Sequence, residues 1–230
     1  MLGFSEHCPF PDSLLGNSRM PFSSMALYED DVRRAGASLP FPVYLGYEID
    51  YYDEYSSFFG SLSERTDFLI AGVHYVRRPD GTFRTPFNPG FSDDDVKRYA
   101  DAAVKVMETG LLTFLAHPDV FLCRRHFDKV AEDAARTIAS AAAELSVPLE
   151  VNGNGLLKGC GENEGYPSPH FWRIASEYVD SAVVSSDAHA VRNLDRTHSF
   201  CRAFAGVFGL SVLEPYDDNG RPRLRKADPS

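Results

Sequence analysis

The sequence predicts an α/β fold built around a parallel sheet, either open or closed into a barrel. Short β-rich runs alternate along the chain with amphipathic helical segments. Most of these runs are nearly continuous in apolar residues, which is typical of parallel strands that are buried on both faces. The chain has 230 residues and is therefore long enough to enclose one large hydrophobic core.

Six predicted strands supply the sheet. They lie at residues 3–6, 43–49, 68–73, 111–116, 148–151 and 182–186. Because helical segments intervene, the strands are expected to pair in parallel. Residues 1–216 are predicted to form one domain. Residues 217–230, which are rich in Pro, Arg and Asp, are expected to form a loose C-terminal tail.

The predicted helices carry start and stop signals. The clearest helix begins after Ser92, whose side chain can cap it while Asp95 completes a capping-box-like pair. An alanine-rich helix is expected at residues 131–145. A third helix is predicted to begin near Pro169, and a fourth follows Ala190.

Composition restricts the partners of the protein. The net charge of −10 argues against a broad nucleic-acid surface, because duplex binding depends on cationic contacts to phosphate. A small phosphorylated substrate is compatible, since divalent cations can reverse the charge of an acidic pocket. No apolar run approaches the roughly 20 residues of a membrane span, and no secretory signal is evident at the N-terminus. We therefore expect a cytoplasmic protein without nucleic-acid or membrane partners.

Residue types that bind metals recur where the predicted strands end. They are His7, Glu48, His74, His117, Glu150, Asp187 and His189. The carboxyl ends of parallel strands face one side of a protein, so these side chains are expected at a common mouth. Asp187 and His189 are two residues apart and should point the same way on an extended segment. A single such histidine is more often an ordinary polar residue, but recurrence at six strand ends predicts a site for Zn²⁺, Mn²⁺ or Fe²⁺.

Phosphate-ester hydrolysis is the reaction that best uses such a cluster. Metals can activate a water and neutralise charge on the phosphoryl oxygens. The sequence holds no nucleophile elbow, G-x-x-x-x-G-K loop or dinucleotide fingerprint. Arginines in the loops after the strands can hold a substrate phosphate, and the candidates are Arg77, Arg78, Arg124, Arg125 and Arg192. The other histidines are interpreted as surface or supporting residues, and they are His126, His170 and His198.

Seven short motifs occur in a fixed order from residue 4 onward. They read FSEHCPFP, GYEIDYY, GVHYV, AHPD, LEVN, the pair Tyr166-Pro167, and SSDAH. In this order they resemble the PHP (polymerase and histidinol phosphatase) superfamily, and within it the monofunctional histidinol-phosphatase branch. The resemblance implies a distorted seven-stranded, TIM-like β/α barrel. It also implies hydrolysis of L-histidinol phosphate to L-histidinol and phosphate, a step of histidine biosynthesis.

The same resemblance implies a centre of up to three divalent metals. By motif position, Glu48 would bridge two of them, and His74 and His117 would complete one of these two sites. Asp187 would belong to the other site. A third site would be formed by His7 with His189.

One departure from the family pattern lies at the N-terminus. The family opens with a strand that carries an H-x-H motif, whereas this sequence starts directly on what should be the second strand. Since the other motifs persist, we expect a truncated start rather than a genuinely reduced protein. Without that first strand, the strand ending at His7 would be an open edge. Dimerisation across this edge is a hypothesis that a monodisperse monomer in light scattering would contradict.

A second departure follows the LEVN motif. The histidinol-phosphatase branch often has G-L-R there, with the arginine close to the substrate phosphate, whereas this chain has Leu157 and Lys158 in the corresponding stretch. Lysine can replace the charge but not the bidentate geometry. Two alternatives therefore stay open beside histidinol phosphatase. The protein could hydrolyse other small phosphate esters or nucleotides, or it could be a non-catalytic metal-binding remnant.

Overall fold

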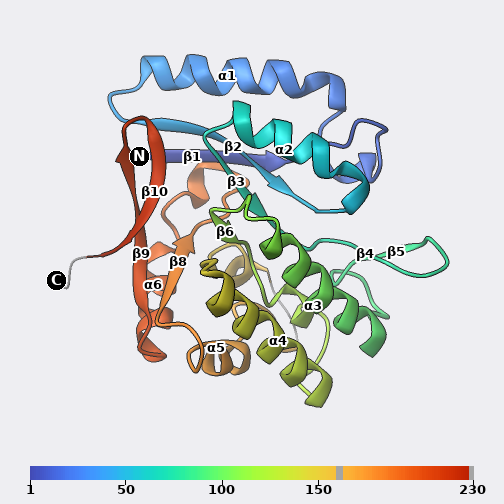
Figure 1. Cartoon of the computed structure of the whole chain (residues 1–230). Coiled ribbons are helices and arrows are strands. Elements are labelled where there is room, and N and C mark those ends of the chain that lie inside the picture. Colours follow the sequence, from blue (N-terminus) through green and yellow to red (C-terminus); the bar gives the residue numbers. More distant parts are fainter. Residues whose placement is uncertain (159–162, 228–230) are drawn as a thin grey trace.

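The structure is a computed structural model that describes residues 1–158 and 163–227. It contains the predicted alternation of strands and helices (Figure 1). The strands are β1 (Leu2–His7), β2 (Val43–Ile49), β3 (Phe68–Ala71), β4 (Val76–Arg77), β5 (Phe83–Arg84), β6 (Phe114–Leu115), β7 (Glu150–Asn152), β8 (Ser181–Ser185), β9 (Ser211–Asp218) and β10 (Arg221–Lys226). The helices are α1 (Met25–Ser38), α2 (Ser56–Arg65), α3 (Asp93–Glu108), α4 (Lys129–Leu145), α5 (Pro169–Ala175) and α6 (His198–Val207).

The central strands form two four-stranded sheets. One has the order β1-β2-β3-β6 and is parallel throughout. The other has the order β10-β9-β8-β7, with β7, β8 and β9 parallel and β10 antiparallel. A single parallel bridge between Leu115 and Leu149 connects the two sheets. The strands β1, β2, β3, β6, β7, β8 and β9 therefore run in one direction, and their carboxyl ends face the same side, whereas β4 and β5 form a separate antiparallel pair.

A closed seven-stranded barrel was expected from the motif resemblance, and the described residues do not show that closure. Within these residues β1 pairs with β2 alone, so its other edge carries no strand. The Tyr44 hydroxyl in β2 donates a hydrogen bond of 2.7 Å to Asp217 in β9. This contact between side chains links the two sheets, but it is not a backbone pairing of their strands. The additional first strand and dimerisation across β1 stay predictions.

The C-terminal tail was predicted wrongly. Residues 211–226 form the hairpin of β9 and β10, which lies against the strands at the edge of the second sheet (Figure 1). Its turn places Asn219 and Gly220 at positive φ angles of 53° and 84°, and the Asn-Gly pair is a strong hairpin signal. An ion pair from Lys226 to Asp180 anchors β10. The high proportion of Pro and Arg concealed this pairing, and the last three residues lie outside the described range.

Helix predictions were right where capping or periodicity is strong. Helix α3 has the predicted capping box, in which the Ser92 side chain accepts from the Asp95 backbone and the Asp95 side chain accepts from the Ser92 backbone. Two helices, α1 and α2, were not predicted. Helix α1 buries only Met25 and Val32, so its apolar period is weak. The helix expected after Ala190 is a short 3₁₀ turn, followed by α6.

The helices cover the outside of the strands (Figure 1). Helices α1 and α2 lie over β1, β2 and β3, while α3, α4 and α5 follow one another along the opposite side of the molecule. The core includes large aromatic side chains without solvent exposure, among them Tyr47, Phe59 and Trp172. Packing of this kind fixes the strands to one another and so fixes where their carboxyl ends lie. No helix in the described range has the length and apolarity needed to span a membrane.

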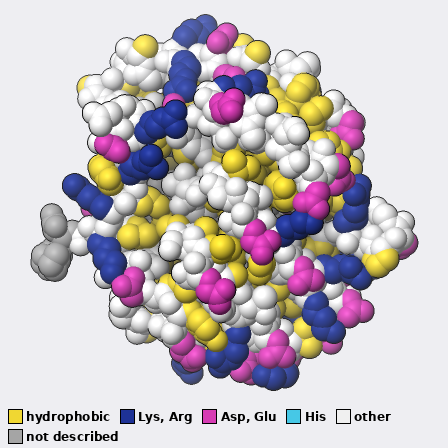
Figure 2. Space-filling model, viewed as in Figure 1, with side chains coloured by type: hydrophobic (Ala, Val, Ile, Leu, Met, Phe, Trp, Pro, Cys, Tyr) yellow, Lys and Arg dark blue, Asp and Glu magenta, His cyan; other side chains and the backbone are white. Residues whose placement is uncertain are grey.

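Charged side chains on the face shown in Figure 2 are mixed. Basic and acidic groups are interspersed there, and no histidine side chain is visible. His74 and His117 are buried. The predicted absence of a nucleic-acid partner stays a prediction.

Candidate metal centre

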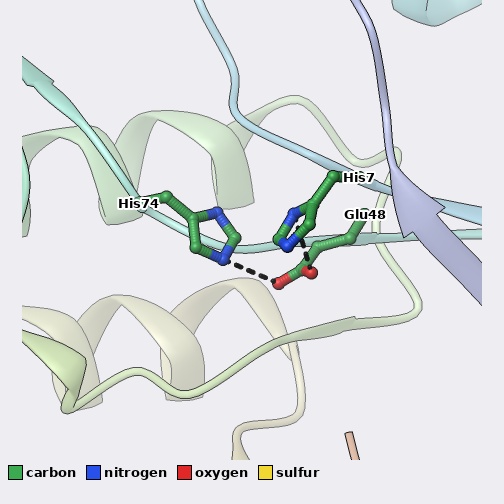
Figure 3. Close-up of side chains that lie close together, drawn as sticks. All are labelled: His7, Glu48 and His74. Atoms are coloured by element: carbon green, nitrogen blue, oxygen red, sulfur yellow. Dashed lines mark ion pairs between the residues drawn. The ribbon is translucent and has the colours of Figure 1, made fainter. Parts of the chain in front are cut away.

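The carboxylate of Glu48 lies among three imidazoles. Its Oε1 is 2.9 Å from His117 Nε2 and 3.5 Å from His74 Nε2, and its Oε2 is 3.4 Å from His7 Nδ1. Figure 3 shows the rings of His7 and His74 converging on the two carboxylate oxygens. We call these four residues, His7, Glu48, His74 and His117, the inner cluster. Each oxygen of the carboxylate faces a different set of nitrogens, as a bridging ligand requires.

Strand register brings the inner cluster together. His7 is the last residue of β1 and pairs in register with Glu48 in β2. Glu48 in turn pairs with Ile70 in β3, four residues before His74. Gly72 makes this approach possible, because a Cβ atom there would lie 2.4 Å from Glu48 Oε1 and 2.5 Å from a ring carbon of His74. The glycine therefore leaves the space that the side chains need.

The backbone of His117 is held on both sides in an uncommon conformation. Its φ angle is +31°, which non-glycine residues rarely adopt. The His117 amide donates to Glu150 Oε2 at 2.8 Å, and the His117 carbonyl accepts from the Tyr99 hydroxyl at 3.1 Å. These contacts from β7 and α3 aim the imidazole at Glu48. Glu150 therefore supports a candidate ligand and does not join the inner cluster itself.

Burial and the charges within the inner cluster shift the pKa values of its members in different directions. Burial alone would raise the pKa of Glu48, but the imidazoles of His74, His117 and His7 outweigh it and lower that pKa to about 2. Burial would lower the pKa of His117, whereas the hydrogen bond and charge of Glu48, with Glu150, raise it to about 9. For His7, burial outweighs the attraction of Glu48 and lowers the pKa. The ionised carboxylate thus attracts cations into a buried pocket.

The donor set fits a divalent metal ion. Ligand atoms from His7, Glu48 and His74 all lie within 4.8 Å of one another. His7 Nδ1, which faces the carboxylate, is buried and has no hydrogen-bond partner among the described residues, and a cation would satisfy it. A mixed imidazole and carboxylate shell is suited to Zn²⁺ and related ions. Metal binding by these residues is therefore chemically reasonable, with His117 beside them.

Asp187 and His189 form the rim of the same site, and we call them the rim pair. They line a cavity of about 170 Å³ together with His7 and Glu48. The expected extended segment is wrong, because Asp187 has a φ angle of +45°, a conformation that Asp tolerates better than most residues. Asp187 nevertheless faces the cavity. Its Oδ2 accepts from the side-chain amides of Asn152 and Asn154, each at 3.1 Å.

Two of the arginines proposed to hold phosphate are paired with carboxylates outside the inner cluster. Arg77 pairs with Glu54, and Arg78 donates from Nε to Asp95 Oδ1 at 2.7 Å. In both cases the guanidinium group is therefore already paired with a carboxylate of the protein. Arg192 is exposed in the 3₁₀ turn after His189. Binding of substrate by any of these arginines stays a prediction.

Lys158 contacts an aromatic side chain, Tyr166, that lies next to the inner cluster. Its ammonium donates to the Tyr166 hydroxyl at 3.0 Å and lies 4.8 Å from the ring centre of Phe87. The ring of Tyr166 is 6.2 Å from that of His117. Lys158 is therefore one aromatic side chain away from a candidate ligand, and its role toward phosphate stays a prediction.

Several residues that shape the site were not selected from the sequence. Asp50 accepts from the His74 backbone at 2.7 Å and lies 3.0 Å from His74 Nδ1. The spacing of Glu48 and Asp50 offered a signal, since alternate residues of a strand share a face. Gly72 and Asn154 gave no comparable signal, because their roles depend on space and on side chains from other strands.

Comparison with known proteins supports the fold. No family model matches the chain, and no curated protein sequence matches it. The structure is similar to that of a protein assigned as histidinol phosphatase hisK from Listeria monocytogenes, with a TM-score of 0.70, 20% identity, and coverage of 86% of this chain and 87% of that one. It is also similar to histidinol phosphate phosphatase from Lactococcus lactis subsp. lactis Il1403 complexed with zinc, L-histidinol and phosphate, with a TM-score of 0.63, 15% identity, and coverage of 96% and 86%. The chain therefore has the α/β fold that these two structures share.

Proposed function

We propose that the protein is a metal-dependent phosphomonoesterase that hydrolyses L-histidinol phosphate to L-histidinol and phosphate. The observation that carries this proposal is the position of Glu48, whose two carboxylate oxygens face three imidazole nitrogens at 2.9 to 3.5 Å. A carboxylate surrounded by imidazole nitrogens is suited to hold divalent cations. The fold shared with the two phosphatase structures adds support, and so does the zinc of the Lactococcus lactis complex.

The residues have distinct parts in this proposal. The inner cluster and the rim pair would hold Zn²⁺, Mn²⁺ or Fe²⁺, up to three ions in all. Such ions supply Lewis-acid charge for the phosphoryl group and activate water. Glu48 stays ionised at neutral pH because its pKa is lowered by the imidazoles around it despite burial. Burial lowers the pKa of His7 and so favours its neutral imidazole, which is the form that binds metal.

Phosphate release tests the proposal. The wild-type chain is incubated with L-histidinol phosphate after loading with Zn²⁺ or Mn²⁺, and inorganic phosphate is measured. We expect release that chelator abolishes and that falls in His117→Ala, since this variant removes a nitrogen beside Glu48. His126→Ala is the matched control, because His126 lies outside the cluster. A folded, metal-loaded chain that releases no phosphate would contradict the proposal.

A second candidate is hydrolysis of other small phosphate esters or nucleotides. Lys158 favours it, because this side chain stands where the histidinol-phosphatase branch often has arginine, and its ammonium is hydrogen-bonded to Tyr166. A single ammonium recognises phosphate as a point charge and gives less geometric selection. A substrate panel separates the two candidates, since the second predicts that another ester is hydrolysed faster than L-histidinol phosphate.

A further inference from the structure

Arg19 is a buried arginine in the irregular segment between β1 and α1. Only 1% of its side chain is exposed. It donates to Asp50 Oδ2 at 2.7 Å and to the backbone carbonyl of Cys8 at 2.7 Å. Its guanidinium also lies 5.1 Å from the ring centre of Phe10. Desolvation of two charges offsets much of the stabilisation that such an ion pair gives, so stability alone accounts poorly for it.

Both contacts lead to the strand ends that carry the inner cluster. Cys8 directly follows His7, and the Cys8 amide donates to the Glu48 carbonyl at 2.8 Å. Asp50 is two residues after Glu48, so Arg19 bonds the Cys8 backbone after β1 and the Asp50 side chain after β2. The guanidinium thus joins the ends of β1 and β2 directly behind the candidate ligands.

Asp50 carries the connection to the third strand end. Its Oδ1 accepts from the His74 backbone at 2.7 Å, and its Oδ2 lies 3.0 Å from His74 Nδ1. An ionised carboxylate can only accept hydrogen bonds, so this closer contact favours the tautomer of His74 that carries its proton on Nδ1. The other nitrogen, Nε2, is then left with a lone pair that faces Glu48 Oε1 at 3.5 Å. A partner of this kind fixes the tautomer and orientation of a metal-binding histidine.

We propose that Arg19 is a positioning residue for the metal centre. By holding Asp50 against His74, it keeps the imidazole in the Nδ1-protonated tautomer, and by holding Cys8 it keeps His7 opposite Glu48. This inference rests on the metal site of the proposed function. Arg19 itself touches neither the candidate ligand atoms nor a substrate.

The test compares Arg19→Met with Arg33→Met as the matched control. Arg33 also pairs with an aspartate, Asp67, at 2.5 and 2.9 Å, and Asp67 also accepts from a backbone amide, that of Leu45. That pair lies at the start of β3, at the other end of the strands. We expect Zn²⁺ affinity, measured by competition with a chromophoric chelator, to fall about 10- to 100-fold in Arg19→Met. Arg33→Met should retain the wild-type affinity.

A spectroscopic measurement separates positioning from a merely structural role. Nitrogen-15 NMR of the imidazoles in the metal-free chain reports which nitrogen of His74 is protonated. We expect Nδ1 in wild type and Arg33→Met, and a mixture of tautomers in Arg19→Met. Arg19→Lys should bind Zn²⁺ more tightly than Arg19→Met but less tightly than wild type. Lysine keeps the positive charge, but it lacks the planar guanidinium that bonds Asp50 and Cys8 at the same time.

Asp50→Asn provides a second variant with almost unchanged shape. An asparagine side chain has one acceptor oxygen and cannot accept from His74 N, His74 Nδ1 and Arg19 together. We expect His74 to shift toward the Nε2-protonated tautomer and Zn²⁺ affinity to fall further than in Arg19→Met.

The proposal is overturned if folded Arg19→Met, or folded Asp50→Asn where Arg19→Met does not fold, retains both the wild-type Zn²⁺ affinity and the Nδ1 tautomer. If the wild-type chain binds no Zn²⁺ at all, the proposed function fails, and the tautomer measurement decides on Arg19 separately.

Discussion

The half of the candidate centre that comes from β1, β2, β3 and the end of β6 is constructed differently from the half that follows β8. Members of the inner cluster are mostly buried and contact one another, with Glu48 7% and His117 3% exposed. In the rim pair, 23% of the Asp187 side chain and 61% of the His189 side chain are exposed. Asp187 is held by neutral amides of Asn152 and Asn154, whereas His74 is held by a carboxylate.

This difference indicates a division of roles. A buried, mutually contacting cluster is preorganised, so a cation binds there without reordering the side chains. An exposed pair held by amides can change its contacts when a ligand enters the cavity. We therefore expect the inner cluster to determine metal affinity, and the rim pair to respond to the substrate.

The largest effect is expected for Glu48→Gln. This change removes the charge that attracts the three imidazoles while keeping the shape of the side chain. Loss of Zn²⁺ affinity should exceed the roughly 100-fold that removal of an outer hydrogen-bond partner can cost. Metal content after dialysis and chelator competition both measure it. Unchanged affinity would place the metal elsewhere.

A large effect is also expected for Gly72→Ala. The added Cβ would lie 2.4 Å from Glu48 Oε1 and 2.7 Å from a ring carbon of His117, so these side chains must move. Zn²⁺ affinity should fall about tenfold or more. The control is Gly60→Ala in α2, where a Cβ would meet no atom of the described residues within 4 Å. That change should stabilise the fold by about 0.5 to 1 kcal/mol in a denaturant titration and leave affinity unchanged.

A smaller effect on metal affinity is expected for Asp187→Asn, together with a clear effect on turnover. Because Asp187 is at the rim, Zn²⁺ affinity should change by about tenfold or less, whereas phosphate release should fall by more than affinity does. Steady-state kinetics at saturating metal measures this. If Asp187→Asn weakens Zn²⁺ binding as strongly as Glu48→Gln, the two halves do not differ in role.

The smallest effect is expected for Asp95→Asn, which concerns stability and not the metal. The hydrogen bond from Arg78 lowers the pKa of Asp95 from 3.8 to about 2. The ionised form therefore stabilises the fold above about pH 4, and this contribution is lost as pH falls through 2. We expect the variant to lose about 1 to 2 kcal/mol at pH 7 and to show a weaker acid dependence, measured by urea unfolding. An unchanged free energy of unfolding at pH 7 would mean that the Arg78–Asp95 pair does not stabilise the fold. Arg78 would then be available for another role.

Much of the inner cluster could be predicted from the sequence because its members end strands. Parallel strands place their carboxyl ends together, so His7, Glu48 and His74 could be grouped without knowledge of their distances. Glu150 ends a strand as well, yet it serves as a hydrogen-bond acceptor for the His117 amide. Strand position alone does not distinguish a ligand from its support.

The remaining features depend on contacts between distant segments. Arg19 lies in a loop without periodicity, so no pattern connected it with Asp50 directly after β2. Helix α1 has few buried apolar residues, and the hairpin after residue 211 contains charged residues that also occur in flexible tails. In each case tertiary packing decides the structure and local composition does not.

Anomalous diffraction at the zinc edge, from crystals of the wild-type chain grown with Zn²⁺, tests the central claim most directly. The account predicts a peak within bonding distance of Glu48 and of at least two of the nitrogens of His7, His74 and His117, and no such peak in Glu48→Gln crystals. A fully occupied zinc that avoids Glu48, or an inner cluster that stays free of metal at saturating Zn²⁺, would contradict it.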